Sequence, residues 1–379
     1  MQEYKICSQC VMDTSDPKIT FDSNGVCNHC TEFKNITSKE WYPNEEGKIK
    51  LDAFISKIKV EGKNNKYDCI IGLSGGVDSS YLALIAKGWG LRTLVVHVDA
   101  GWNSELAVAN IEKIVKHCNY HLHTHVVGWS EMRDLHLAYL RAGIANQDVI
   151  QDHIFFSSLY HFATKNGIRY ILSGGNLATE GIFPSSWHGS AMDAINLKAI
   201  HRKYGKKKLR HYKTISFFQY YIWYPFVKKM RTFRPLNYMP YNKNQAISEL
   251  ESKIGWRNYG RKHGESLFTK FFQNHYLPQK FGFDKRRPHL SSLIVTDQIT
   301  RDEAMEMLKI PLYDPQELEN DIQFLCKKLN ISREEYEEIM NAPIQDYTDF
   351  PNWNKLQSLV KKGSRYFNKL FGKKITVYS

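Results

Sequence analysis

The stretch SGGVDSS, residues 74–80, combines the residue types that hold a phosphate group. It follows the apolar run CIIGL and precedes the helical pattern YLALIA, so its glycines stand at a strand-to-helix turn. Gly75 and Gly76 let backbone N–H groups converge on an anion, and the N-terminus of a helix adds partial positive charge. Ser74, Ser79 and Ser80 add hydroxyl donors. The stretch therefore predicts a phosphate-binding loop.

Asp78 and the lack of a lysine narrow the chemistry of this loop. Asp78 can cap the helix or hold Mg²⁺ against phosphates. Walker-type loops end in GK[ST], whereas Val77 follows the glycines here. An ordinary tight turn with an aspartate N-cap would explain a lone glycine pair, but the whole heptad favours phosphate binding.

Four cysteines near the N-terminus have the spacing of a metal site. Cys7 and Cys10 form one CxxC knuckle, and Cys27 and Cys30 form a second one after 16 intervening residues. This spacing is typical of four-cysteine zinc sites. His29 could compete as a ligand, but four thiolates already complete a tetrahedron. Such a closed site does no chemistry, so we expect structural Zn²⁺; a metal-free cysteine ribbon is the alternative.

Strand-like and helical patterns alternate after residue 66. The strand-like runs are YDCIIGL, RTLVVHVD, HLHTHVV and RYILSGG, and helical patterns cover residues 79–87, 104–118 and 152–166. This alternation predicts an α/β fold with a doubly wound parallel sheet. Ligands of such sheets bind at the carboxyl ends of the strands. Asp99 and the SGGN stretch with Gly174, Gly175 and Asn176 follow strands in this way, so we expect them at the ligand site.

The composition divides the chain into four expected units. They are a zinc module (1–45), an ATP-binding domain (46–190), a basic, aromatic-rich segment (191–248) and a helical C-terminal region (249–379). An amphipathic helix is expected to place Ile49, Leu51, Phe54, Ile55 and Ile58 on one side. In the last unit, Thr300 with Glu303, Ser332 with Glu335, and Asp314 before Pro315 mark helix starts.

The excess of positive charge is local. The chain has 52 Lys and Arg against 39 Asp and Glu, and residues 194–248 contain 13 Lys and Arg and no acidic residue. This segment predicts contact with a polyanionic partner or a membrane surface; a solvated basic face is the alternative. Residues 1–10 lack the apolar run of an export signal, and residues 215–227 are too short and interrupted to span a bilayer, so we expect a cytoplasmic protein.

The SGGxDS pattern resembles the signature of the PP-loop ATP pyrophosphatase family. The resemblance implies ATP binding in a doubly wound domain and cleavage between the α- and β-phosphates, with AMP transferred to a substrate oxygen. A lysine directed at the γ-phosphate is then not needed. The nucleotide-binding residues that it implies are Ser74, Gly75, Gly76, Val77, Asp78, Ser79, Ser80, Asp99, Gly174, Gly175 and Asn176, with Mg²⁺ as the accompanying ion.

Three further stretches resemble bacterial N-acetyl sugar amidotransferases of surface-polysaccharide (lipopolysaccharide and O-antigen) and flagellin-glycan biosynthesis. They are the N-terminal knuckles, NLATEGIFPSSWHGSAMDAINLKAIHRKYG from residue 176, and GWRNYGRKHGESLFTKFFQNHYLPQKFGFDKRRPHLSSLI from residue 255. The resemblance implies a carbon–nitrogen ligase reaction. ATP adenylates the oxygen of a sugar acetamido group, and ammonia from a separate glutaminase subunit displaces AMP and leaves an acetamidino group. The sugar would be nucleotide-linked or lipid-linked, and no nucleic-acid partner is expected.

Charged residues in the third stretch could stabilise the charge that builds up on the phosphates. The candidates in this stretch are Lys262, His263, Lys280, Lys285 and Arg286, with Arg287 as a substrate-binding residue. Asp78 of the SGGVDSS loop is a further catalytic candidate, and Glu180 after SGGN is a further substrate-binding candidate. The cations could equally hold a diphosphate or carboxylate group of the substrate. An ordinary surface residue is the alternative for each of them. Trp102, Trp187 and Trp256 are expected in the core rather than stacked on a ligand.

Two other functions fit part of the sequence. Some tRNA-thiolating enzymes join CxxC modules to an SGGxDS loop, but they commonly use further paired cysteines, whereas Cys69, Cys118 and Cys326 are isolated here. The third possibility is a non-catalytic nucleotide-binding zinc adaptor, against which the intact SGGVDSS stretch argues.

Overall fold

The computed structural model describes residues 3–187, 189–260, 264–360 and 362. Within these residues the strands form a five-stranded sheet in which every pairing is parallel. In spatial order the strands are β3 (His121–Val126), β2 (Thr93–Asp99), β1 (Cys69–Gly72), β4 (Tyr170–Leu172) and β5 (Arg231–Phe233). The α/β fold with a parallel sheet is therefore confirmed.

Helices cover both faces of the sheet, because successive strand residues point to opposite sides. On one face Ile71 packs with α2 (Glu45–Gly62) and α3 (Val77–Gly88), and Val95 packs with α4 (Glu105–Cys118). On the other face Ile70 and Val96 pack with α5 (Trp129–Ala142), α6 (Val149–Lys165) and α8 (Ala194–Tyr204). The strands β1, β2 and β4 are thus buried on both sides, as their near-continuous apolar residues require, whereas the edge strand β3 is largely exposed.

Most of the predicted elements form where the sequence pattern placed them. The predicted helices 79–87, 104–118 and 152–166 correspond to α3, α4 and α6. The buried side of α2 includes Leu51, Ile55 and Ile58, but Ile49 is 69% exposed, so its predicted place on that side is wrong. Helix α5 and strand β5 were not predicted.

The expected division of the chain at residue 190 cuts through the sheet. Strand β5 lies inside the basic segment 191–248 and hydrogen-bonds to β4, so this segment completes the sheet as its fifth strand. Three residues long and only partly buried, β5 carries too little periodicity to be recognised from sequence.

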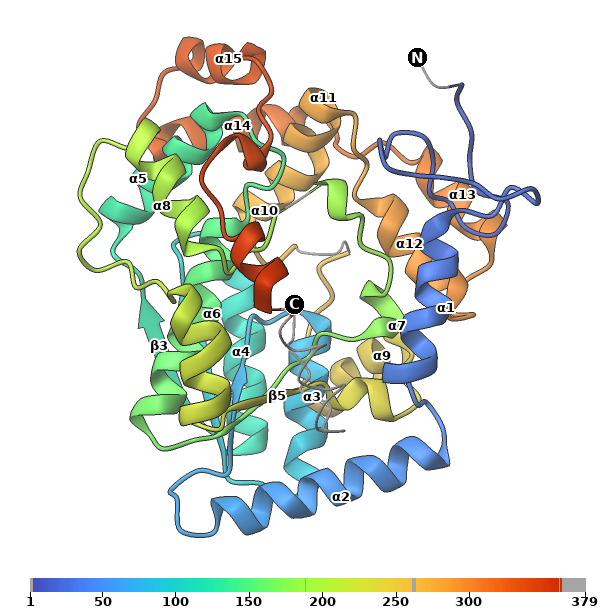
Figure 1. Ribbon diagram of the computed structural model, residues 1–379, viewed down its shortest axis with the longest axis vertical. Helices are drawn as coiled ribbons and strands as arrows, with labels where there is room; N and C mark the ends of the chain where they lie inside the picture. Colours follow the sequence, from blue (N-terminus) through green and yellow to red (C-terminus); the bar gives the residue numbers. More distant parts are fainter. Residues whose placement is uncertain (1–2, 188, 261–263, 361, 363–379) are drawn as a thin grey trace.

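The C-terminal region is helical, as predicted, and lies beyond the carboxyl ends of the strands. Thr300 forms the predicted capping box with Glu303, and the side chains of Asp314 and Ser332 cap the two helices that follow. Figure 1 places α2 across the lower end of the molecule and α11, α14 and α15 at the upper end. The helices not yet bounded are α1 (Asn28–Glu40), α7 (Leu177–Glu180), α9 (Lys243–Ile254), α10 (Leu267–Phe271), α11 (Leu277–Phe281), α12 (Arg286–Val295), α13 (Arg301–Lys309), α14 (Pro315–Leu329) and α15 (Arg333–Asn341). Short 3₁₀ turns are η1 (Ser185–Trp187), η3 (Pro235–Tyr238) and η5 (Tyr347–Asp349), and π-helical turns are η2 (Gln219–Val227) and η4 (Phe272–Tyr276).

No helix among the described residues is long and apolar enough to cross a bilayer. The three tryptophans expected in the core are buried there, with exposed fractions of 1% for Trp102 and Trp256 and 2% for Trp187.

The strand order reverses between β1 and β4, and here two loops make a close contact. A Cβ atom at Gly174, after β4, would lie 2.9 Å from the backbone of Asp78 and from the amide nitrogen of Ser79, after β1. Backbone cannot move aside as a flexible side chain can, so this approach requires glycine.

We expect Gly174→Ala to lower the free energy of unfolding by about 1–3 kcal/mol, since the new methyl group forces the two loops apart. Urea unfolding monitored by circular dichroism measures this change. Gly88→Ala is the matched control, because a Cβ there meets nothing within 4 Å and removes glycine from a helix. Equal stability of the two variants would contradict the close contact.

Candidate nucleotide and metal sites

The SGGVDSS loop has an open helix N-terminus. Gly75 has φ +88°, and Gly76 is the N-cap of α3 with extended backbone. Among the residues that the structure describes, no side chain caps this helix end. The first amides of α3 thus point at the turn without a side-chain acceptor, and a helix N-terminus of this kind suits an anion.

Hydroxyl groups inside the loop fix its shape. The Oγ atoms of Ser74 and Ser79 lie 3.1 Å apart, and the amide of Gly76 donates to Ser74 Oγ over 3.2 Å. From outside the loop, Trp256 Nε1 and the Tyr259 hydroxyl both donate to the carbonyl of Gly75, over 3.1 and 2.9 Å. These bonds hold the peptide unit after Gly75 in its orientation within the turn.

Asp78 joins the loops after β1 and β4. Its Oδ1 accepts hydrogen bonds from Asn176 Nδ2 over 3.0 Å and from the Tyr241 hydroxyl over 2.5 Å. Burial, and then the nearby carboxylate of Asp78, raise the pKa of Tyr241 above its usual value, so the phenol stays protonated and donates. Asn176 also caps α7 through Oδ1, which accepts from the amide of Thr179 over 2.9 Å. The carboxylate therefore has a fixed orientation at the strand crossover.

Asp99 ends β2 beside this loop system. Its Oδ1 accepts from the amide of Gly101 over 2.8 Å and from Asn103 Nδ2 over 3.2 Å. Asn103 also donates to His97 Nε2, while His97 Nδ1 lies 2.9 Å from the carbonyl of Leu73, just before the loop. The predicted residues at the ends of β1, β2 and β4 thus lie at one edge of the sheet.

Glu180 and Glu265 also approach the glycine loops. A Cβ atom at Gly175 would lie 3.9 Å from Glu180 Oε2 and from Arg234 Nε, and one at Gly76 would lie 3.0 Å from Glu265 Oε1. Arg234 comes from the basic segment and was not predicted for the site. Its position depends on β5, whose pairing with β4 the sequence did not indicate.

Two of the predicted C-terminal cations have structural partners. Lys280 Nζ donates to the carbonyls of Ile339, Met340 and Ala342 over 2.7–3.0 Å, at the end of α15. Arg286 pairs with Asp284 and donates to the last carbonyls of α13. These contacts use the donors of both side chains at helix C-termini, where a cation is favourable. Their predicted catalytic role therefore has no support in their contacts.

The other predicted C-terminal residues lie in different parts of the chain's structure or outside the described residues. Arg287 donates to the carbonyl of Val11 over 2.8 Å and pairs with Asp13 over 3.0 Å, so it joins the N-terminal module rather than a substrate. Lys285 Nζ lies 4.2 Å from the ring centre of Phe183, in the stretch that follows α7. Lys262 and His263 lie outside the described residues.

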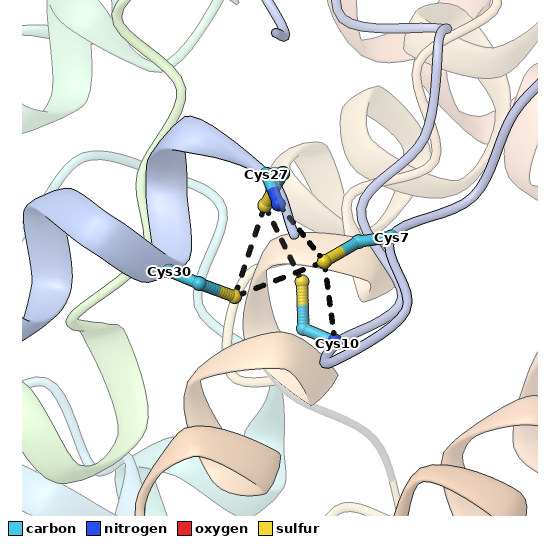
Figure 2. Close-up of side chains that lie close together, drawn as sticks. All are labelled: Cys7, Cys10, Cys27 and Cys30. Atoms are coloured by element: carbon cyan, nitrogen blue, oxygen red, sulfur yellow. Dashed lines mark hydrogen bonds between the residues drawn. The ribbon is translucent and has the colours of Figure 1, made fainter. Parts of the chain in front are cut away.

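The four knuckle cysteines form a buried cluster. Figure 2 shows their sulfur atoms facing one another. Neighbouring sulfurs lie 3.7–3.9 Å apart, and a metal with sulfur ligands at about 2.3 Å requires about 3.8 Å in a tetrahedron. Backbone amides donate to Cys7 Sγ and Cys10 Sγ, which favours thiolates. This cluster can hold a metal ion and, being closed, leaves no position for a substrate.

His29 lies outside the cluster, as expected. Its Nε2 is 2.6 Å from Asp16 Oδ2, and Ser186 donates to the other oxygen of the same carboxylate. Asp16 thus connects the second knuckle to η1.

The cysteine module is attached to the C-terminal helices. Arg301 Nε donates to the carbonyls of Cys7 and Cys10 over 3.3 and 3.1 Å, and Ser291 Oγ accepts from the amide of Val11. On its other side α12 contacts the segment after SGGN, since Ser292 Oγ accepts from the amide of Ile182 over 2.9 Å. The cysteine module therefore supports α12, and α12 supports α7 at the glycine loops (Figure 1).

Comparison with known proteins gives one match to a described domain family. Residues 265–363 match the family described as LPS biosynthesis protein WbpG-like, C-terminal domain. This range includes α10 to α15, so the helical C-terminal region is similar to a domain of lipopolysaccharide biosynthesis proteins.

The other similarities are more distant. An uncharacterised protein of Methanocaldococcus jannaschii, MJ1599, is 32% identical over 114 residues, which are 29% of this chain and 39% of that protein. Among solved structures, an NH₃-dependent NAD synthetase from Campylobacter jejuni has a TM-score of 0.33 and 14% identity, covering 79% of this chain and 98% of that one. An NMN synthetase from Francisella tularensis has a TM-score of 0.30 and 13% identity, covering 79% and 97%.

We expect Cys7→Ser to lose most of the bound metal and to lower Tm by at least about 5 °C, because metal binding at such a cluster contributes directly to folding. Metal content by plasma emission spectrometry and a thermal melt measure both effects. Cys118→Ser is the control, since Cys118 is a buried cysteine of α4 outside the cluster. Unchanged metal content in Cys7→Ser would rule out the cluster as the metal site.

We expect Arg301→Met to keep the metal but to lose it to a chelator about tenfold faster, because the knuckle carbonyls lose hydrogen bonds from a charged donor. Release after addition of EDTA can be followed with a metal-sensitive dye. Arg333→Met on α15 should behave as wild type, because Arg333 pairs with Glu319 and Glu337 and lies over the ring of Tyr336, away from the knuckles. Equal release rates would show that Arg301 does not stabilise the knuckles.

Proposed function

We propose that this chain is an ATP-dependent, AMP-forming sugar amidotransferase. It would convert the N-acetamido group of a nucleotide-linked or lipid-linked sugar to an acetamidino group, with ammonia from a separate glutaminase subunit. The orientation of Asp78 beside an uncapped helix N-terminus, at the crossover between β1 and β4, is the observation that carries the proposal. The similarity of residues 265–363 to a lipopolysaccharide biosynthesis domain supports a glycan substrate.

The first step would be adenylation of the sugar amide. The amide oxygen attacks the α-phosphorus of ATP, the bond to the bridging oxygen breaks, and pyrophosphate leaves. The amides at the start of α3 and the hydroxyls of Ser74 and Ser79 would bind the departing pyrophosphate, whose charge increases in the transition state. Mg²⁺, when bound, would neutralise part of this charge, and Asp78 would hold it. No Walker-type lysine follows Gly76, and this agrees with reaction at the α-phosphorus rather than the γ-phosphorus.

The second step would be displacement of AMP by ammonia. Ammonia adds to the imidate carbon, the carbon–oxygen bond to AMP breaks, and one proton leaves the nitrogen to give the amidine. A carboxylate near the reacting carbon could accept that proton. Glu180 and Glu265 are the candidates, because both approach the glycine loops.

We further propose that the cysteine cluster holds Zn²⁺ in a structural role. Four thiolates at tetrahedral spacing suit zinc, and the burial of all four leaves no open ligand position. The ion would supply rigidity to the module that supports α12 and would take no part in the transfer reaction.

We expect Asp78→Asn to lower the rate of AMP and pyrophosphate formation by about 100-fold or more, because the amide cannot hold the metal ion against the phosphates. The assay contains MgATP, ammonium chloride and a panel of nucleotide- and lipid-linked N-acetyl sugars, and mass spectrometry detects replacement of the acetamido oxygen by NH. Tyr241→Phe removes one hydrogen bond to the carboxylate, so a smaller loss, on the order of tenfold, is expected.

Asp52→Asn, an exposed aspartate of α2, is the control for both variants. Parallel reactions contain tRNA in place of sugar. AMP release that depends on tRNA and not on sugar would overturn the proposed substrate, and full activity of Asp78→Asn would remove Asp78 from the site.

A further inference from the structure

The outward face of the π-helical turn η2 is apolar. Phe226 and Val227 are 50% and 52% exposed, Phe218 at the N-cap is 57% exposed, and Ile222 and Trp223 are each 37% exposed. In Figure 1 this turn is the yellow-green helix drawn over α6. Single exposed apolar residues are ordinary, but five along one turn form a surface patch that indicates an interaction. We call these five residues the η2 face.

The winding of the helix gathers these side chains on one side. They recur after four or five residues, which matches the wider turn of a helix bonded from residue i to i+5, as between the amide of Lys228 and the carbonyl of Trp223. An α-helix, whose period is 3.6 residues, would distribute the same five positions over about half of its circumference. The π-helical winding thus narrows the exposed face.

The inner side of η2 is firmly packed. Tyr220 and Tyr224 contact the ring of Tyr160 on α6, and Tyr221 packs on Trp353. Tyr221 and Tyr224 are almost completely buried, with exposed fractions of 4% and 2%. The aromatic inner side therefore holds the η2 face in place without burying it.

Cations border the η2 face. Lys213, Lys228, Lys229 and Arg231 flank the turn along the chain and are exposed, and Lys228 Nζ lies 5.5 Å from the ring centre of Trp223. No acidic residue occurs between Asp193 and Glu249. The border is therefore positive along the whole segment.

The neighbouring basic loop is also fixed with its charges outward. Backbone amides of Lys206 and Lys207 donate to Asp134, and those of Arg210, His211 and Tyr212 donate to Glu131. Both carboxylates lie on α5 and are at least nine-tenths buried. Because the backbone of the loop binds the carboxylates, the side chains of Lys206, Lys207 and Arg210 remain exposed.

We infer that the η2 face binds the surface of an anionic lipid bilayer. Aromatic and aliphatic side chains with lysines at the border are the composition of helices that lie in the membrane interface. Lysine is depleted from protein–protein interfaces, and Ile222 and Val227 offer no ring for stacking nucleic-acid bases. The chain from residue 350 onward carries seven Lys and Arg and no acidic residue, so charge disfavours that segment as the cover of this face.

The test is co-sedimentation with vesicles of phosphatidylcholine alone and of phosphatidylcholine mixed with phosphatidylglycerol. We expect binding to the anionic vesicles, weakened by salt, and little binding to the neutral ones. Trp223→Ser with Phe226→Ser should weaken binding at least tenfold, because both apolar anchors are lost. Lys213→Glu with Lys228→Glu should also weaken binding, by at least about fivefold for each cation.

Matched controls distinguish binding through the η2 face from nonspecific adsorption to the vesicles. Val60→Ser on α2 removes a side chain that is 76% exposed, and Lys34→Glu on α1 reverses an exposed charge elsewhere; both should bind as wild type. Circular dichroism confirms that each variant is folded before it is compared, and any unfolded double variant is replaced by its single substitutions.

The inference would be overturned if the wild-type chain did not bind anionic vesicles, or if the control variants lost binding equally. It would also be overturned by a wild-type oligomer that Trp223→Ser with Phe226→Ser dissociates in light scattering. The last result would assign the face to a second copy of the chain. Retention of an RNA oligonucleotide in place of vesicles would likewise assign it to nucleic acid.

Discussion

The contact between the loops after β1 and β4 is the constraint on which the candidate site depends. A parallel sheet leaves an opening where its strand order reverses, and ligands bind there. In this chain the opening is narrow, because Gly174 lies so close to the backbone of Asp78 and Ser79 that a Cβ atom would not fit between them. Asn176 then reaches Asp78 with one end of its amide and caps α7 with the other. The side chain of Asn176 thereby connects the carboxylate of Asp78 to the N-terminus of α7.

The cysteine cluster is connected to this opening through helix α12. Its knuckle carbonyls accept from Arg301, and the adjacent residue Val11 bonds to Ser291 and Arg287. Helix α12 in turn holds the backbone after α7 through Ser292. A closed four-cysteine cluster has no position for a reactant, so the role that we propose for it is structural: it fixes the helix against which α7 and the SGGN turn are placed.

Local sequence signals predicted the parts of the site that depend on local spacing. The CxxC knuckles, the SGGVDSS turn and the carboxyl-end residues Asp99 and Asn176 all follow from neighbours in the chain. The hydrogen bonds that Tyr241, Trp256 and Tyr259 donate to the SGGVDSS loop were not predicted. Each of these residues is more than 160 residues away from the loop in the sequence. Helix α5 and strand β5 were missed as well. The sheet ends in a strand of three residues, so its pattern was too short to recognise.

Charged residues predicted the site least well, because the sequence shows where the cations are but not which acceptors they contact. The motif KFGFDKRR was predicted to bind phosphate or substrate. In the structure Lys280 and Arg286 donate to carbonyls at helix ends, and Arg287 donates to a carbonyl of the cysteine module. In the segment 194–248 the reverse holds. There the backbone amides satisfy Glu131 and Asp134, so the lysine and arginine side chains keep their charge at the surface. The two basic regions therefore differ in which part of the residue contacts the acceptor: the side chain in KFGFDKRR, and the backbone in the loop of residues 206–212.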